Sequence, residues 1–387
     1  VVLAKDGKEV KEVPMETHVA PLSEETVSLP IPVQNLPGEY AVTVSFRLKE
    51  DTVWAKRGHE VAFGQGVYKV EVPAKAVKPA RFEVIRSGHD FCVRGENFDV
   101  LFSYLNGGLA SYRYGGVEMI QMIPRPNFWR APVDNDNGSL MQMRCGQWKL
   151  ASMYLSHKYP TGGHYPGMHI PEIEVLDDSA KITFTYAMPT TPATECKLSY
   201  QVYGDGSIRT TLTYDPVEGL GDMPEFGVMF KFDADYDNVT WYGMGPEETY
   251  VDRCEGAKLG IYRNKVEDNM AKYMVPQECG MHVDTEWVKV KRSKVLDNRK
   301  RHMEQSELTF RAGNEISHSK FAFSCLPYTS EELENATHQE ELPPARRTVL
   351  CIYGAVRGVG GIDSWGSDVE EEYRIPGNRD IEVEFTM

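Results

Sequence analysis

Several features of other protein classes are missing from this sequence of 387 residues. It contains no run of 18 or more apolar residues, so we expect no membrane-spanning helix. Charged residues interrupt the opening stretch, VVLAKDGKEVKEV, which therefore lacks the apolar segment of a secretory signal peptide. Positive charge is also in deficit, with 42 Lys and Arg against 57 Asp and Glu and a net charge of −15. A chain this acidic repels phosphate backbones, so no nucleic-acid partner is expected.

Sequence patterns for disulfides and metal ions are missing as well. The seven cysteines are widely spaced and include no CxxC pair, so we expect reduced thiols in a cytoplasmic protein and no zinc site. The histidines form no HxH or HxxxH pair, and no metal or cofactor is expected in this chain. His338 could act as a base, but a hydrogen-bonded structural role is the simpler interpretation.

Period-two alternation of apolar and polar residues is abundant instead. It runs through residues 40–48 (YAVTVSFRL) and 181–186 (KITFTY), and turn signals such as DGK and DGS separate such segments. Because side chains alternate between the two faces of a strand, this pattern predicts an all-β fold of stacked antiparallel sheets. Helical periodicity is almost absent. One helix is predicted over residues 329–339, where Thr329 and Glu332 can form a capping box.

A stretch rich in Lys, Pro and Ala, residues 72–84 (VPAKAVKPARFEV), separates two alternating regions. We therefore expect two domains. Residues 1–78 should form a small β-sandwich, and residues 79–387 one large β domain.

The stretch RPNFWRAPVDNDNG, residues 125–138, resembles a calcium loop at first sight. Such a loop needs oxygen ligands at positions 1, 3 and 5 and glutamate at position 12. Counted from Asp134, position 5 is Gly138 and position 12 is Cys145, so the calcium pattern fails. Its two arginines can fork onto carboxylates and its two aromatics can be buried. The sequence therefore predicts a long ordered loop with a packing role.

A second cluster, WYGMGPEETYVDR, spans residues 241–253 and holds Glu247, Glu248 and Asp252. Paired carboxylates carry out glycoside hydrolysis. Acids that are adjacent in sequence point in different directions, however, and an acidic chain provides such runs by chance. We assign no catalytic residue here.

A third cluster, GVGGIDSWGSD, spans residues 358–368. Its four glycines allow close approach of the backbone to another group. Trp365 lies among small polar residues, unlike a core tryptophan in an alternating strand. Two interpretations are equally open: an exposed indole that stacks on a sugar, or a buried loop anchor.

Together and in this order, the three clusters resemble the C-terminal third of bacterial β-galactosidases of glycoside hydrolase family 2. NFWRAPVDNDNG is similar to a signature of the last domain, YGMGPEETYVDR fits G-x-G-P-x-E-x-Y-x-D-R, and GVGGIDSW fits G-[IV]-G-G-x-D-S-W. TVWAKRGHEVAFGQ, residues 52–65, resembles the end of the preceding immunoglobulin-like domain. The resemblance covers essentially the whole chain.

This resemblance implies a partial immunoglobulin-like sandwich over residues 1–78, lacking its first strands. It implies a large antiparallel super-sandwich, galactose-mutarotase-like, over residues 79–387. In that family both catalytic glutamates and the Mg and Na ligands lie in or near a preceding TIM barrel, which this chain lacks. A barrel needs about 250 residues of alternating strands and helices. The chain is therefore expected to be a C-terminal fragment, inactive alone, of a retaining enzyme.

For the site, the resemblance implies that Trp365 reaches into the barrel's active site and contacts the galactoside, while Asp363 and Ser364 shape its loop. The expected partners are the missing barrel, the galactoside and further copies of the parent, a homo-oligomer, with no membrane. Residues 125–138 would pack near the barrel. Two alternatives remain: an aldose-1-epimerase-like enzyme with a paired His and Glu, and a free-standing carbohydrate-binding module.

Overall fold

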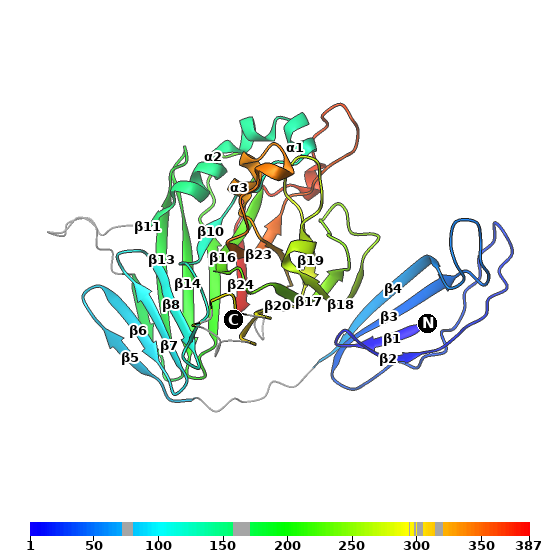
Figure 1. Cartoon of the computed structure of the whole chain (residues 1–387), viewed down its shortest axis with the longest axis horizontal. Coiled ribbons are helices and arrows are strands. Elements are labelled where there is room, and N and C mark those ends of the chain that lie inside the picture. The colour runs from blue at the N-terminus through cyan, green and yellow to red at the C-terminus, as the bar shows by residue number, and fades with distance from the viewer. Residues whose placement is uncertain (72–79, 158–170, 294, 298, 300–304, 314–319) are drawn as a thin grey trace. The chain divides into compact units, whose positions relative to one another are not determined.

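The computed structural model describes residues 1–71, 80–157, 171–293, 295–297, 299, 305–313 and 320–387 (Figure 1). Antiparallel strands dominate it, which confirms the predicted all-β class. The chain divides into two compact units, Val1–Ala76 with Lys258–Ile261, and Val77–Ala257 with Tyr262–Met387. The boundary predicted at residue 78 lies outside the described residues.

The first unit contains one four-stranded antiparallel sheet in the order β2-β1-β3-β4. Asp6 and Gly7, with φ of 50° and 74°, form the two-residue turn between its first strands, as expected for a β-hairpin. Leu3 and Tyr40 are buried against this sheet. One layer of the predicted sandwich is thus present among the described residues of the unit. Its strands are β1 (Val2–Lys5), β2 (Lys8–Glu12), β3 (Gly38–Arg47) and β4 (Glu60–Val70).

The other three sheets among the described residues are built from the second unit, apart from Lys258–Ile261 of one strand. The first is β5 (Glu83–Arg86), β6 (Asp90–Arg94), β7 (Phe98–Ser103), β8 (Gly108–Tyr114) and β9 (Val117–Glu118). The second follows the order β10 (Arg125–Asn127), β16 (Glu225–Asp233), β23 (Arg347–Val356), β22 (Phe321–Leu326) and β19 (Met281–Thr285). The third follows the order β11 (Ser156–His157), β13 (Ser179–Met188), β14 (Thr194–Tyr203), β15 (Ile208–Tyr214), β24 (Ile381–Thr386), β21 (Glu307–Ala312), β20 (Trp287–Lys291), β17 (Asn238–Gly245) and β18 (Lys258–Lys265), and β12 (Glu172–Val175) pairs with β13.

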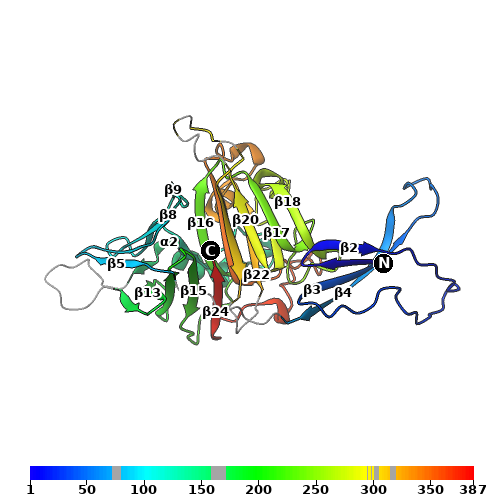
Figure 2. The same cartoon turned by 90° about the horizontal axis from the view of Figure 1, so that it is seen from below.

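A continuous apolar core joins these three sheets. In β14 every second residue is buried, because one face of the strand packs on the core and the other faces outward. The ring of Phe230 on β16 lies 5.9 Å from that of Phe385 on β24 and 4.9 Å from that of Phe310 on β21. The second and third sheets therefore pack on each other, and Figure 2 shows β16 beside β24 and β15.

Three α-helices lie at one edge of the second unit (Figure 1). They are α1 (Asp134–Gly138), α2 (Met141–Tyr154) and α3 (Ser330–Asn335), and short 3-10 helices span Val266–Asn269, Gln339–Glu341 and Glu371–Tyr373. The capping box of Thr329 and Glu332 is confirmed, although the helix ends at Asn335, four residues earlier than predicted. Among the described residues, no helix is long and apolar enough to cross a bilayer.

Helix α2 was not predicted, because its apolar residues do not form a single stripe. Met141, Cys145 and Trp148 are buried at helical spacing, as the 3.6-residue period requires. Met143 and Tyr154, however, are exposed on the same helix, so the sequence shows little contrast between its faces. The prediction that residues 125–138 form a long loop is also wrong in part, since the stretch begins as β10 and ends as α1.

Candidate functional site

The segment that carries Trp365 follows β23 as an outward turn, and the indole is 90% exposed. The carboxylate of Asp363 accepts hydrogen bonds from the backbone N–H of Trp365 (2.9 Å) and of Ser367 (3.1 Å), and from the Ser367 hydroxyl (2.6 Å). These bonds, led by that of the hydroxyl, hold the pKa of Asp363 below its usual value. Ser364 is exposed, and its hydroxyl bonds to no described residue. Of the two interpretations of Trp365, the structure therefore supports the presented indole and not the buried anchor.

Glycine is required at specific places in this turn. Gly360, Gly361 and Gly366 have φ of +70°, +99° and +91°, a left-handed region that other residues rarely adopt. A Cβ at Gly366 would lie 2.5 Å from the carbonyl oxygen of Gly138. The turn therefore packs directly on the end of α1, and any side chain at position 366 would separate them.

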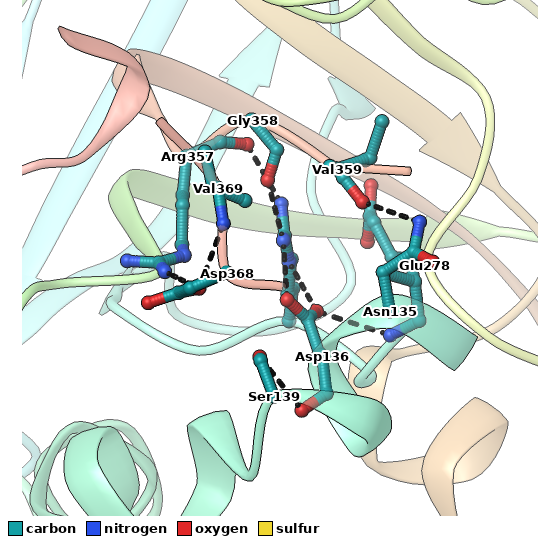
Figure 3. A network of polar contacts seen from close by, with 12 residues as sticks. Asn135, Asp136, Ser139, Glu278, Arg357, Gly358, Val359, Asp368 and Val369 are labelled. Carbon is teal, nitrogen blue, oxygen red and sulfur yellow. Dashed lines mark hydrogen bonds and ion pairs between the residues drawn. The ribbon is translucent and has the colours of Figure 1, made fainter. Parts of the chain in front are cut away.

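Arg130 holds the start of this turn through hydrogen bonds to its backbone. Its guanidinium is 1% exposed and forks onto Asp136, with Nε to Oδ2 at 3.0 Å and Nη2 to Oδ1 at 2.9 Å, as predicted for this arginine. It also donates to the carbonyl oxygens of Arg357 (2.7 Å) and Gly358 (2.8 Å). Figure 3 shows these acceptors around one centre. The first and third sequence clusters are thus joined by a single buried cation.

The second cluster meets the third at the same place. The carboxylate of Asp252 accepts from the backbone N–H of Val359 (3.0 Å) and of Gly360 (2.8 Å). On the other side, the side-chain amide of Asn135 donates to the Val359 carbonyl at 2.9 Å (Figure 3). Residues 357–360 are therefore fixed by polar contacts from both of the other clusters.

The remaining acids of the second cluster do not form a catalytic pair. Glu248 accepts from the backbone N–H of Gly280 (2.7 Å), from Tyr273 (2.5 Å) and from Arg253. Glu247 is exposed on the turn. These bonds tie Glu248 to the surrounding backbone and side chains.

An ion-pair network at the far end of the turn was missed by sequence reasoning. Arg357 is fully buried and binds Asp368 and Asp222, the latter at 3.1 Å, and Arg144 of α2 binds Asp368 at 2.7 Å. Partial burial disfavours ionisation of Asp368, but bonds from Arg144 and Arg357 hold its pKa well below the usual range. Arg144 and Asp222 are far from the third cluster in the sequence, so only the structure shows that they meet Arg357 and Asp368. This network holds the C-terminal end of the turn at Asp368, and Arg130 holds its N-terminal end at Arg357 and Gly358.

Two buried carboxyl groups near Arg130 were also missed. Glu225 accepts from the Asn127 amide at 3.0 Å, and Glu278 accepts from the Tyr250 hydroxyl at 3.3 Å. Burial raises the pKa of both groups, and that of Glu278 to about 8. Arg130 acts in the opposite direction on each of them. Burial therefore outweighs the guanidinium of Arg130 at both groups and favours their protonated forms.

The raised pKa of Glu278 predicts that the stability of the fold depends on pH. Glu278 ionises near pH 4.5 in the unfolded chain and near pH 8 when folded, so the unfolded state binds fewer protons between these values. The free energy of unfolding should therefore fall as pH rises from 4.5 to 8. Glu278→Gln should flatten this slope, as measured by urea denaturation at several pH values.

The interval from pH 6.5 to 8 is the informative one. Burial lowers the pKa of His282 to about 4, so that residue adds an opposite slope only below pH 6.5. Equal slopes for the wild type and Glu278→Gln above pH 6.5 would contradict the prediction.

His338 and His282 do not match the epimerase alternative, which needs a His and a Glu together in a cleft. His338 pairs with Glu341 at 2.9 Å on the surface beyond α3, as a structural interpretation expects. His282 is buried, with its ring 4.2 Å from that of Trp241 and 5.1 Å from that of Phe323. Neither arrangement provides an acid and a base for a sugar.

Comparison with known families completes this description. The model of the beta galactosidase small chain matches residues 94–387, three-quarters of the chain, including all three clusters. The chain belongs to the beta-galactosidase small chain family. The model of beta-galactosidase domain 4 matches residues 1–68.

Two curated relatives are named as a beta-galactosidase and as a beta-galactosidase small subunit. The chain is 37% identical to a beta-galactosidase of Halalkalibacterium halodurans, aligned over 100% of its own length and 36% of the relative. It is 40% identical to the beta-galactosidase small subunit of Latilactobacillus sakei, over 79% of its own length and 98% of that subunit. It therefore spans about a third of the first relative and nearly all of the second.

Among solved structures, a putative aldose 1-epimerase of Escherichia coli K12 aligns with 77% of the chain and 97% of its own, at a TM-score of 0.38 and 7% identity. A galactose 1-epimerase of Lactobacillus acidophilus aligns with 80% of the chain at a TM-score of 0.32 and 10% identity.

Proposed function

We propose that this chain completes the active site of a family 2 β-galactosidase by presenting Trp365 to the galactoside. The observation that carries the proposal is an exposed indole on a turn whose backbone is held from three sides. Buried Arg130 and the carboxylates of Asp252 and Asp363 hold this turn. Such fixed support suits a side chain that contacts a substrate. The family membership supplies the reaction in which this indole takes part.

The indole offers a flat apolar surface to the C–H face of a galactose ring. Asp363 shapes the turn by accepting two backbone N–H groups, so the backbone that carries the indole is held before substrate arrives. Ser364, beside Trp365, is exposed and can reach the same ligand. The role of the chain is thus to position and bind the substrate.

The chemical step lies outside this chain in our proposal. In a retaining glycosidase one carboxylate forms the glycosyl ester and a second carboxyl group acts first as acid and then as base. The carboxyl groups at this site are hydrogen-bonded within the fold and support the backbone, so the two catalytic acids belong to a TIM barrel of the parent enzyme. That enzyme is a homo-oligomer in the cytoplasm.

The Mg and Na ions that the resemblance implies also belong outside this chain. Among the described residues, no group of three or more His, Cys, Asp or Glu side chains is placed to hold a metal ion.

The test separates this proposal from an independent enzyme. The purified chain should hydrolyse a chromogenic β-galactoside at background rate, and mixing it with the barrel-containing part of the enzyme should restore turnover. Robust hydrolysis by the chain alone would overturn the proposal. Accelerated mutarotation of fresh galactose, measured by polarimetry, would favour the epimerase alternative.

A free-standing sugar-binding module is the remaining alternative. It predicts saturable heat when the chain alone is titrated with galactose or lactose. Our proposal predicts none at millimolar sugar, because a single exposed indole gives too little buried area without the rest of the pocket.

A further inference from the structure

A second candidate site lies at the edge of the five-stranded sheet that contains β10. A cavity of about 210 Å³ opens there between β10, β16, α2 and the start of α3. Its lining, as far as the structure describes it, includes no residue of the 357–368 turn. It is therefore separate from the site described above.

The sheet register brings cations onto one face of this cavity. Arg125 on β10 is directly opposite Met229 on β16, and period-two alternation places Lys231 on the same face as Met229. Lys149 of α2 lines the cavity from the other side and is bound to Glu334 at 2.7 Å. Three basic side chains thus converge on one small space in a chain of net charge −15.

Two of these cations have no directly bonded acidic partner, although the charges of Glu331 and Glu332 act on Lys231 from nearby. Neither Arg125 nor Lys231 forms an ion pair with any residue that the structure describes. Lys231 is half-buried, and burial together with the positive charge of Arg347 lowers its pKa. Glu331, at the exposed start of α3, is the one acid in the described lining. Gathering like charges in a half-buried space is unfavourable unless an anion enters.

The apolar part of the lining is adaptable. Met122, Met153 and Met229 border the cavity, beside the buried ring of Trp129. Methionine side chains adjust to irregular shapes and recur at binding surfaces. A ligand that fits this lining has a charged head and an apolar body.

We propose that this cavity binds a small organic oxyanion, with its phosphate or carboxylate head on Arg125 and Lys231 and its body against the methionines. Arginine and lysine recognise both kinds of head by charge-assisted hydrogen bonds. The volume limits the ligand to about the size of a single ring with its charged group. The site is independent of the proposed galactoside site.

Isothermal titration of the chain at constant ionic strength tests the proposal. Phenyl phosphate and benzoate present the two heads on the same body, and inorganic phosphate presents the head alone. Phenyl phosphate or benzoate should bind saturably, at least about fivefold more tightly than inorganic phosphate. Lys231→Met should weaken that binding at least about tenfold, as expected when a charged hydrogen bond is lost.

Two further variants keep the result interpretable. Arg125→Gln changes an exposed residue of the edge strand and should weaken binding without lowering the melting temperature. Lys197→Met removes a partly exposed lysine from β14, outside the cavity, and should leave binding unchanged. Absence of saturable binding to all three probes, or equal binding by the wild type and Lys231→Met, would overturn the proposal. Equal affinity for inorganic phosphate and the aromatic anions would overturn the role of the methionines.

Discussion

Replacing Trp365 by alanine in the complete β-galactosidase should lower kcat/KM for a galactoside roughly thirtyfold. An indole face covering about 80 Å² of apolar sugar surface contributes about 2 kcal/mol at about 25 cal/mol per Å². Because the contact already exists in the bound substrate, most of the loss should appear as a higher KM. Steady-state kinetics with a chromogenic galactoside measure both parameters. The kcat/KM of Trp365→Phe should lie between those of the wild type and Trp365→Ala.

The control for this experiment is Trp54→Ala. Trp54 is also exposed, at 64%, and belongs to the first unit. Its replacement removes the same side-chain volume but should leave kcat and KM unchanged. If Trp365→Ala behaves like Trp54→Ala, then the indole does not contact the substrate and the proposed function loses its main support.

Arg130→Met should lower the free energy of unfolding of the second unit by about 3–5 kcal/mol. Removal of one partner from a buried ion pair leaves the other charge uncompensated, and that cost falls in this range. Here Asp136 would lose both of its guanidinium bonds, and the carbonyl oxygens of Arg357 and Gly358 would lose their donor. Urea denaturation followed by tryptophan fluorescence measures the change, since five of the six tryptophans lie in this unit.

Arg144→Met is the matched control, because it removes a partly exposed arginine from the ion-pair network at the other end of the turn. The Arg144 side chain is 42% exposed, and a surface ion pair contributes about 0–1 kcal/mol. Arg130→Lys should be intermediate, since it keeps the charge but loses the fork. A change of less than about 1 kcal/mol for Arg130→Met would show that the buried pair does not stabilise the turn.

The sequence predicts the local features of this protein well. Alternation predicted the strands and the Thr329–Glu332 spacing predicted a capping box, whereas the exposure of Trp365 was left open between two interpretations. Each of these depends on neighbours in the chain, for which periodicity and turn chemistry are sufficient evidence.

The features that the sequence does not predict depend on long-range pairing or on burial. Arg357 and Glu278 are ordinary charged residues in the sequence, and nothing nearby marks them as buried. Helix α2 escaped prediction because residues such as Met143 place apolar groups on its outer face. The sequence analysis did not predict that the three clusters meet, and the bonds from Arg130 and Asp252 to one backbone segment are seen only in the structure.

The position of Arg130 in the chain has a consequence for biosynthesis. Its partner Asp136 is six residues away, whereas the carbonyl oxygen of Arg357 is 227 residues away. At about 5–20 residues per second, a ribosome needs roughly 10–45 s to make the intervening polypeptide. Throughout that interval the nascent chain offers Arg130 its acidic neighbour but not that carbonyl. The salt bridge can therefore form early, and the indole-bearing turn takes its shape only when translation of the unit is nearly finished.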